Sequence, residues 1–260
     1  MYGIIRSGMA SAMHEISVVS NNISNAGSTG FKKSDVSFAD IYGSGTPDVV
    51  ARTATGDGSM IAGTRRNDGQ GAVVSRGGAL NLAMLGSGMF TTAPADANGD
   101  PSAARVFTRN GEFSIDKDGF VRSSDASFVL GADGGPIQVP YTSEEGVNLS
   151  QLEIGTDGTV SASYGNNIEN MGQLAVANFS NLGGLRNIGG ARFVQSQQSG
   201  APLFGTAEQN GFGSIQSGAL EGSNVDITQE MTVMIRAQQQ FNGASRVLQA
   251  NSDMVEKLTR

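Results

Sequence analysis

Apolar side chains recur at both ends of this chain in steps that alternate between four and three residues. That alternation is typical of helices that pair along a narrow apolar face. In the N-terminal stretch the positions are Ile5, Met9, Ala12, Ile16, Val19 and Ile23. The pattern predicts a helix of about six turns that has to bury this face against a partner.

The same alternation returns near the other end, after Asp226. Asp226 followed three residues later by Gln229 resembles a capping box, which marks the start of a helix. The apolar positions are Met231, Met234, Ala237, Phe241, Ala244, Leu248, Asn251, Val255 and Leu258. Because only these two stretches share the period, we expect them to pair as a coiled coil. Residues 1–34 with 223–260 then form one terminal helical domain.

The remaining faces of both predicted helices are rich in amides and hydroxyls and poor in charge, as at Ser17, Asn21 and Gln238. A helix that is exposed on its own commonly carries Glu–Lys pairs four residues apart. In addition, Gly243 costs the second helix about 1 kcal/mol relative to alanine. An isolated pair of this length is marginal. The composition therefore favours helices that are stabilised by further copies of the chain.

The segment between the first helix and the middle of the chain, SNNISNAGSTGFKK, ends that helix abruptly. Gly27 and Gly30 can adopt positive φ without a Cβ clash, so we expect them to cap the helix and turn the chain away. The side-chain amides of Asn21, Asn22 and Asn25 can satisfy backbone groups near that turn.

Residues 35–222 carry tight-turn signals at short intervals, and most of the 37 glycines lie between residues 27 and 222. The hairpin-type dipeptides are Asn98-Gly99, Asn110-Gly111, Asp118-Gly119, Asp133-Gly134 and Asp157-Gly158. Short strands joined by such turns are typical of a sandwich or an irregular barrel. The expected fold class is therefore α+β, with paired terminal coiled-coil helices around a mainly β middle domain at 35–222.

Few residue types suited to catalysis or metal binding are present. The chain has no cysteine, and its one histidine, His14, has no second histidine with which to share a metal or a proton. The Asp96–Asp100 stretch begins like a calcium loop but has Pro101 and Phe107 where that loop needs glycine and glutamate. We therefore expect no enzyme activity, no cofactor and no metal.

The charge and the hydropathy of the chain limit the classes of partner that it can bind. The net charge of −7 and the absence of a basic cluster argue against nucleic-acid binding. At the N-terminus Arg6, His14 and Glu15 interrupt the apolar residues, so the sequence shows neither a cleaved signal peptide nor a membrane span. A protein of this kind that leaves the cytosol would need a route without signal cleavage.

Several separated motifs resemble those of the bacterial flagellar rod and hook proteins. NNISNA followed by TGFK is similar to that family's N-terminal signature, and TRNGEF and ALEGSNVD are similar to its later elements, in the same order. The resemblance covers nearly the whole chain. The matching positions are Asn21, Asn22, Asn25, Gly30, Phe31, Arg109, Asn110, Gly111, Leu220, Glu221, Ser223, Asn224, Val225 and Asp226.

The resemblance implies a structural subunit that polymerises helically around an export channel and transmits torque for motility. Its partners would be copies of itself, the adjacent rod, hook or junction proteins, the flagellar type III export apparatus and a cap protein. It would lie in the hook-basal body, outside the cytoplasm. The seam residues named above would then be assembly contacts.

The sequence leaves alternatives open, both for the subtype within this family and for the class of protein. Residues 38–42 and 204–226 look more like a hook protein, which we slightly favour, although the length is that of a rod protein. One alternative is an extracellular β-rich adhesive module that dimerises through its terminal helices. Another is a β-rich hydrolase, which would need a convergent acid–base pair.

Overall fold

The computed structural model describes residues 2–41, 58–96, 99–143 and 146–259, without the side chains of 258 and 259. Two long helices flank a middle that is mainly β, so the α+β class predicted from the sequence is confirmed. The chain forms two compact units. Residues 1–26, 33–67 and 225–260 make the helical unit, and residues 27–32 with 68–224 make the β unit.

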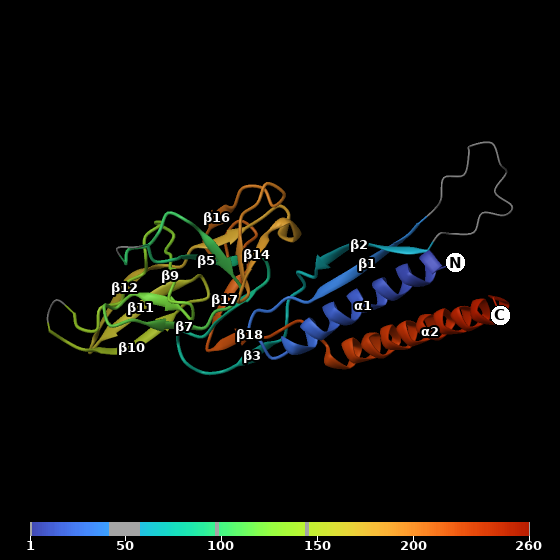
Figure 1. Cartoon of the computed structure of the whole chain (residues 1–260). Coiled ribbons are helices and arrows are strands. Elements are labelled where there is room, and N and C mark those ends of the chain that lie inside the picture. The colour runs from blue at the N-terminus through green and yellow to red at the C-terminus, as the bar shows by residue number, and fades with distance from the viewer. Residues whose placement is uncertain (1, 42–57, 97–98, 144–145, 260) are drawn as a thin grey trace. The chain divides into compact units, whose positions relative to one another are not determined.

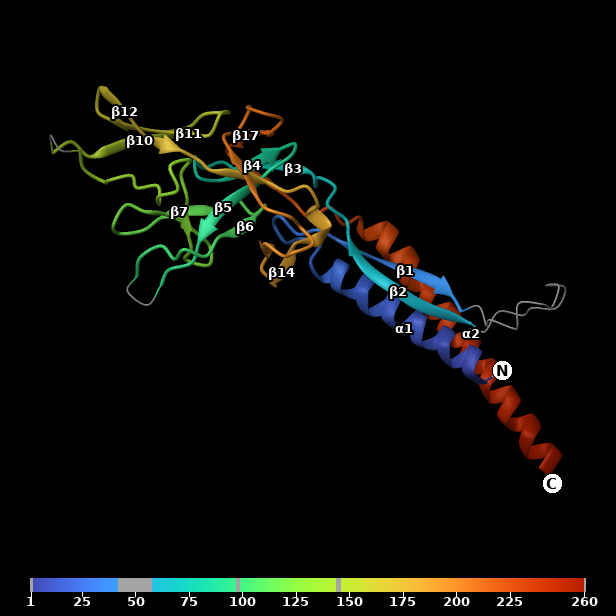
Figure 2. The same ribbon diagram turned by 90° about the horizontal axis from the view of Figure 1, so that it is seen from above.

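The helical unit is built on α1 (Tyr2–Ser24) and α2 (Ile227–Thr259), which lie side by side and antiparallel (Figures 1 and 2). The side chain of Asp226 caps α2, because its Oδ1 accepts the backbone N–H groups of Thr228 and Gln229 at 2.9 and 3.2 Å. The sequence therefore located the start of this helix correctly.

A hairpin of β1 (Ser34–Asp40) and β2 (Ser59–Arg66) packs on α1 in the same unit (Figure 2). The hydroxyls of Ser11 and Ser59 lie 3.2 Å apart, and His14 Nε2 lies 3.0 Å from the hydroxyl of Thr64. The sequence analysis had assigned these strands to the β-rich domain. Tyr42, part of its hook-like segment, lies outside the described residues.

The β unit holds all the other strands, and every pairing between its described strands is antiparallel. Their bounds are β3 Val73–Ser75, β4 Leu82–Leu85, β5 Met89–Ala93, β6 Val106–Thr108, β7 Phe113–Ile115, β8 Val121–Ser123, β9 Phe128–Val129, β10 Leu149–Ile154, β11 Thr159–Tyr164, β12 Asn167–Gln173, β13 Val176–Asn178, β14 Arg186–Gly189, β15 Arg192–Val194, β16 Leu203–Gly205, β17 Ser214–Ser217 and β18 Ala219–Glu221, with one short 3-10 turn at Leu182–Gly184.

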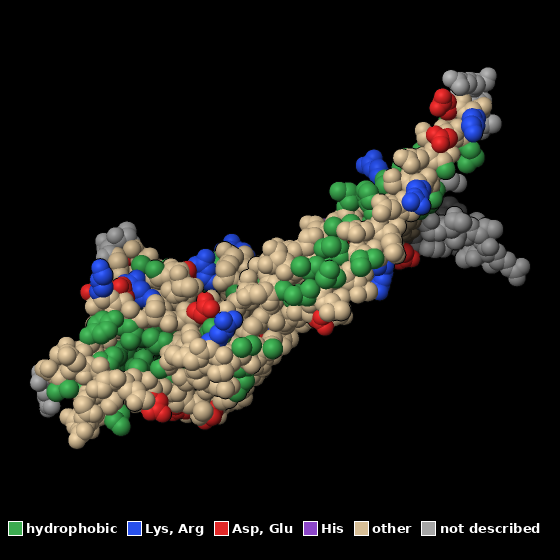
Figure 3. Space-filling view, turned by 90° about the horizontal axis from the view of Figure 1, so that it is seen from below, with side chains coloured by type: hydrophobic (Ala, Val, Ile, Leu, Met, Phe, Trp, Pro, Cys, Tyr) green, Lys and Arg blue, Asp and Glu red, His purple; other side chains and the backbone are tan. Residues whose placement is uncertain are grey.

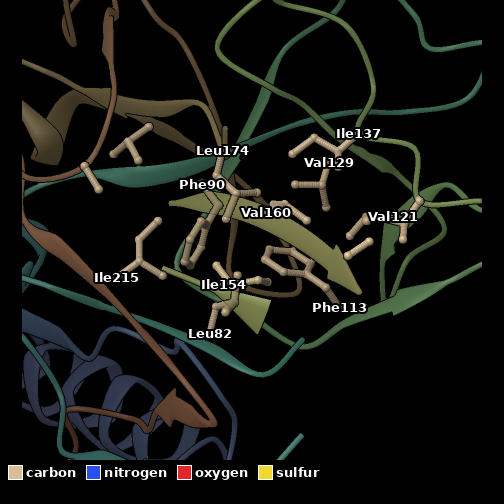
Figure 4. Close-up of a cluster of buried hydrophobic side chains, with 14 of the residues drawn as sticks. Leu82, Phe90, Phe113, Val121, Val129, Ile137, Ile154, Val160, Leu174 and Ile215 are labelled. Carbon is tan, nitrogen blue, oxygen red and sulfur yellow. The ribbon is translucent and has the colours of Figure 1, made fainter. Parts of the chain in front are cut away.

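The largest sheet of this unit follows the order β14-β15-β6-β5-β9-β8-β7, and β13 joins β5 to β16. A separate three-stranded sheet has the order β10-β11-β12. Their apolar faces meet in one core, where Phe90 and Phe113 pack edge to face with ring centroids 5.3 Å apart (Figure 4).

Three of the predicted turns lie where the sequence put them. Asp118-Gly119 connects the paired strands β7 and β8, and Asp157-Gly158 connects β10 and β11. Gly134 also lies in a tight turn with positive φ. Asn98 lies outside the described residues.

The predicted hairpin at Asn110-Gly111 is wrong, since β6 pairs with β5 and β15 whereas β7 pairs with β8. Gly111 serves close packing instead. A Cβ there would lie 1.8 Å from the backbone oxygen of Leu82.

The two glycines that follow α1 differ in backbone conformation and in the space around them. Gly30 has a φ of +68°, as predicted, and its N–H donates to the backbone oxygen of Glu221 at 2.8 Å. Gly27 is outside the left-handed region and has open space around it.

We predict that Gly30→Ala lowers the free energy of unfolding by about 2 to 5 kcal/mol, from left-handed strain and a backbone clash. The new Cβ would lie 2.7 Å from the backbone nitrogen of Asn110. Gly27→Ala is the matched control and should change stability little. Chemical denaturation followed by circular dichroism measures both, and equal effects would contradict this account of Gly30.

A pH-dependent contribution is expected from Asp157. Its carboxylate accepts the hydroxyl of Thr159 at 2.6 Å and the N–H of Thr159 at 3.0 Å, which lowers the pKa of Asp157. A lowered folded-state pKa stabilises the fold above the unfolded pKa, and this contribution disappears as the pH falls through the folded pKa. Asp157→Asn should therefore cost stability at neutral pH and progressively less below pH 3.8. Urea denaturation across this range tests it, and a cost that does not vary with pH would refute it.

Candidate functional site

No group of three or more His, Asp or Glu side chains is placed to hold a metal ion within the described ranges. The features that stand out are two networks of buried charge, one in each unit, and the outer faces of the two helices.

In the helical unit, Asn22 joins the end of α1 to the start of β1. It is 1% exposed, and its amide makes two bonds with the backbone of Ser34, donating to the oxygen at 2.9 Å and accepting the N–H at 3.0 Å. Its Nδ2 also donates to Glu230 Oε2 at 3.0 Å, in the first turn of α2. One amide side chain thus ties together three elements of this unit.

The carboxylate of Glu230 is buried and faces Lys33. The Lys33 Nζ atom lies 3.5 Å from Glu230 Oε1 and 3.5 Å from Asp35 Oδ1. A small hollow of about 170 Å³ lies beside these groups, with Glu15 on its α1 side. A carboxylate in the first turn of α2 also complements the helix dipole.

In the β unit, Glu221 has the most completely buried carboxylate, with none of its surface exposed. Its Oε1 accepts Lys32 Nζ at 2.5 Å and the N–H of Gly71 at 2.9 Å. Its Oε2 accepts Arg109 Nη1 at 3.1 Å. A buried carboxylate with this many donors is fully compensated.

The two cations of this network also bind backbone oxygens. Lys32 Nζ donates to Gly69 at 2.7 Å, and Arg109 Nη2 donates to Gly86 at 2.7 Å. Burial lowers the pKa of Lys32 by removing water from its ammonium group, and the bond to Glu221 opposes that shift. We call Lys32, Arg109 and Glu221 the ion cluster.

The other positions matching the family motifs surround these networks or support turns. Asn110 Oδ1 accepts the N–H of Glu112, and Asn224 Nδ2 donates to the backbone oxygen of Gly69. Asn25 Nδ2 donates to the backbone oxygen of Asn21, as expected for a residue at a helix end. The buried motif residues are Asn22, Gly30, Arg109, Gly111, Leu220 and Glu221; the half-buried ones are Asn25, Phe31, Asn110, Ser223, Asn224 and Val225; Asn21 and Asp226 are exposed.

Most of the predicted seam positions turn toward the interior of the helical unit. Ala12, Val19 and Ala237 are buried, and Ile5, Met9, Ile16, Ile23, Met234, Phe241, Ala244, Leu248 and Asn251 are half-buried. Met231 and Val255 are exposed, and the side chain of Leu258 lies outside the described residues.

Each of the two exposed positions has a geometric explanation. Glu230 occupies the inward position at the start of α2, so the inward series runs through Glu230, Met234 and Ala237, and Met231 falls on the flank. Val255 lies near the C-terminal end of α2, which has 33 residues against 23 in α1 and extends past it (Figure 2).

Apolar side chains also cover outer parts of both helices, and Figure 3 shows them along the helical unit. The exposed ones are Tyr2, Ile4 and Met13 on α1, and Ile227, Met231, Ile235, Val247, Met254 and Val255 on α2. Ile227, Met231 and Ile235 follow each other at four-residue steps and form one stripe, which we call the flank stripe.

Sequence reasoning missed two things here. It did not bring Lys32, Arg109 and Glu221 together, although each stands in a recognisable motif. It also did not mark Lys33 and Glu230, for which the available signal was a pair of adjacent lysines in a chain poor in charge.

Taken with the fold, these features define a structural α+β protein with paired terminal helices and outer apolar helix faces. Residues 83–162 match the family model described as the flagellar hook protein FlgE/F/G D1 domain, and residues 216–260 match that of the flagellar basal body rod FlgEFG protein C-terminal region. Within the described residues, no helix has an apolar stretch long enough to span a membrane.

Relatives match along almost the whole chain. The chain is 32% identical to the flagellar basal-body rod protein FlgG of Bacillus subtilis, over 97% of this chain and 95% of that protein. It is 28% identical to FlgG of Agrobacterium fabrum, over 99% and 97%. A flagellar hook protein FlgE of Rhizobium meliloti is 34% identical over 69% of this chain and 44% of that protein. The chain belongs to the flagellar rod and hook axial protein family, whose members are structural proteins and not enzymes.

We predict that Glu221→Gln costs about 3 to 5 kcal/mol of stability, because it leaves two buried cations without a counter-charge. Lys32→Met should cost less than half as much. The remaining ion pair of Arg109 and Glu221 has no net charge. The backbone oxygen of Gly69 still accepts a hydrogen bond from the side-chain amide of Asn224. Chemical denaturation of the three proteins measures the order. A larger cost for Lys32→Met would show that Glu221 is not the centre of the cluster.

Proposed function

We propose that this protein is a rod subunit of the bacterial flagellar basal body that polymerises helically through its terminal helices. The observation that carries the proposal is the match to basal-body rod proteins over nearly the full length of both chains. The outer apolar faces of α1 and α2 supply the surface that such a polymer would bury.

A rod subunit is favoured over a hook subunit, which the sequence analysis had slightly preferred. The hook protein that was matched is more than twice as long as the aligned region, since only 44% of it is covered. The rod proteins are covered to 95% and 97%. A chain of 260 residues therefore corresponds in extent to the rod proteins.

The proposed contact surface has two parts. One is the flank stripe of Ile227, Met231 and Ile235, each about half exposed. The other is the overhanging end of α2, where Met254 is 60% exposed and Val255 is 47% exposed. Fully burying an exposed aliphatic side chain of this size contributes about 1.5 to 3 kcal/mol, and these half-exposed side chains would contribute about half of that each. Several such contacts, repeated in a helical lattice, would then support assembly. The seam between α1 and α2 would support these contacts from within as a coiled coil.

Localisation and partners follow from the same proposal. The protein would lie in the flagellum outside the cytoplasm, beside other rod, hook or junction proteins. It would be exported by the flagellar type III apparatus without a cleaved signal peptide, and a cap protein would assist its assembly. The match to rod proteins supports this placement.

We predict that Ile235→Asp prevents open-ended association while leaving the β unit folded. The substitution puts a charge into the flank stripe, where a neighbouring copy would remove it from water. Sedimentation at rising concentration measures association, and circular dichroism measures folding. Gln240→Asp, at an exposed polar position on a different face of α2 from the flank stripe, is the matched control and should assemble.

Two outcomes would contradict the proposal. If Ile235→Asp assembles like the parent protein, the flank stripe is not a contact. If the parent protein stops at a fixed dimer at every concentration, the chain is better described by the alternative of a module that dimerises through its terminal helices.

A further inference from the structure

The β unit contains a pocket of about 430 Å³, within the range of about 300 to 1,000 Å³ that small-molecule sites occupy. Its floor is made of three buried residues, Thr91 of β5, Leu130 and Ala175. Phe204 of β16 also lines it, and this side chain is 54% exposed. The pocket therefore combines a closed floor with an aromatic side chain that a ligand can reach.

Two tight turns carry part of the polar rim of this pocket, and backbone hydrogen bonds fix both of them. In one turn the N–H of Gly134 donates to the oxygen of Gly131 at 2.8 Å. In the other the N–H of Phe212 donates to the oxygen of Gln209 at 2.9 Å, and both central residues have positive φ. That conformation is the type I′ turn, which Asn-Gly favours. The rim is thus largely formed before a ligand arrives, which lowers the entropic cost of binding.

The polar side chains of the rim are poorly satisfied in the single chain. Arg105 Nη2 donates to one backbone oxygen at 3.4 Å, and no carboxylate of the described residues lies within ion-pair distance of its guanidinium. Asp133 Oδ1 accepts the N–H of Gly135 at 3.2 Å, whereas its Oδ2 has no bond within the described part of the chain. Gln209 and Asn210 add two exposed amides. A cation and a carboxylate thus line one pocket without pairing with each other.

A ligand for this pocket has to satisfy both charged groups at once. A hydroxyl can do so, because it accepts a hydrogen bond from a guanidinium and donates one to a carboxylate. Side-chain amides also bond to hydroxyls, as donors and as acceptors. A polyanion is disfavoured by the carboxylate of Asp133 and by the net charge of −7. The rim therefore favours an uncharged ligand with several hydroxyls, and the ring of Phe204 favours one with an apolar C–H face.

We propose that this pocket binds a short uncharged saccharide. One sugar ring packs its C–H face on Phe204, and its hydroxyls accept from Arg105 and donate to Asp133. The amides of Gln209 and Asn210 bind the hydroxyls that remain. This activity goes beyond the rod proposal and does not depend on it, because the pocket belongs to the β unit and the proposed assembly contacts lie on α2.

Saturation-transfer NMR on the full-length protein tests the proposal with three probes, namely maltose, cellobiose and N,N′-diacetylchitobiose. We expect at least one of them to bind with a Kd in the micromolar to millimolar range, and the transfer to be strongest at its ring C–H protons. No binding of any of the three at millimolar concentration would overturn the proposal. Binding of the zwitterionic dipeptide glycylphenylalanine in preference to all three would also overturn it, since the ligand would then be a peptide.

Substitutions at Phe204 assign the binding to this pocket. Phe204→Ala should weaken it about tenfold, because the stacking surface is lost, and Phe204→Tyr should retain it. The matched control is Leu203→Ala, since Leu203 is 61% exposed, precedes Phe204 on the opposite face of the strand and does not line the pocket. Thermal unfolding of each variant checks that the fold is intact. Equal affinities of the parent and Phe204→Ala would exclude the pocket.

Asp133→Asn tests the polar contact. The amide oxygen can still accept the N–H of Gly135, so the turn should persist, but the charged acceptor is lost. Affinity should fall about threefold to tenfold, as expected for one weakened hydrogen bond, and an unchanged affinity would remove Asp133 from the site. Ile235→Asp should bind the sugar like the parent protein, so loss of assembly and loss of sugar binding are separate results.

Discussion

The fold of the β unit depends on one buried carboxylate, whose lost hydration is compensated by hydrogen-bond donors and opposite charges. Glu221 is completely buried, and removing a charge from water costs several kcal/mol unless donors replace the water. Lys32, Arg109 and the backbone of Gly71 supply those donors, and each comes from a different part of the chain. Because the cations in turn bind the oxygens of Gly69 and Gly86, the cluster fixes backbone segments as well as side chains. This makes the family motifs understandable as parts of one electrostatic unit.

The helical unit repeats this arrangement with different residues. Glu230 is its buried carboxylate, and Lys33 and Asn22 are its partners. Lys32 and Lys33 are adjacent in the chain but belong to different units, as do Glu221 and Glu230. Each unit thus holds one of the two lysines and one of the two glutamates. The chain crosses between the units four times, and two of these crossings, at 32/33 and 224/225, have a buried or half-buried charged residue close by on both sides.

Local pattern was enough to predict the helices, the cap at Asp226 and the turns at Asp118-Gly119 and Asp157-Gly158, because each depends on residues close in sequence. It was not enough for the ion cluster, whose members Lys32 and Glu221 are 189 residues apart. It assigned the β1–β2 hairpin to the β-rich domain, since a strand pattern does not reveal which element the strand packs on. It placed Met231 on the inner face of α2, because a search for apolar residues cannot identify a buried glutamate as an inward position. The wrong hairpin at Asn110-Gly111 has a similar cause: the glycine there is required by packing against Leu82 and not by a turn.

The apolar surfaces that remain exposed on α2 lie in two separate places. The flank stripe is close to the start of that helix, and Met254 and Val255 lie at its overhanging end. Both surfaces are apolar and not directional, so they can bury area against any complementary helix face. Because they lie far apart along one helix, a contact made at one of them leaves the other open to a further copy, as an open-ended polymer of the proposed kind would require.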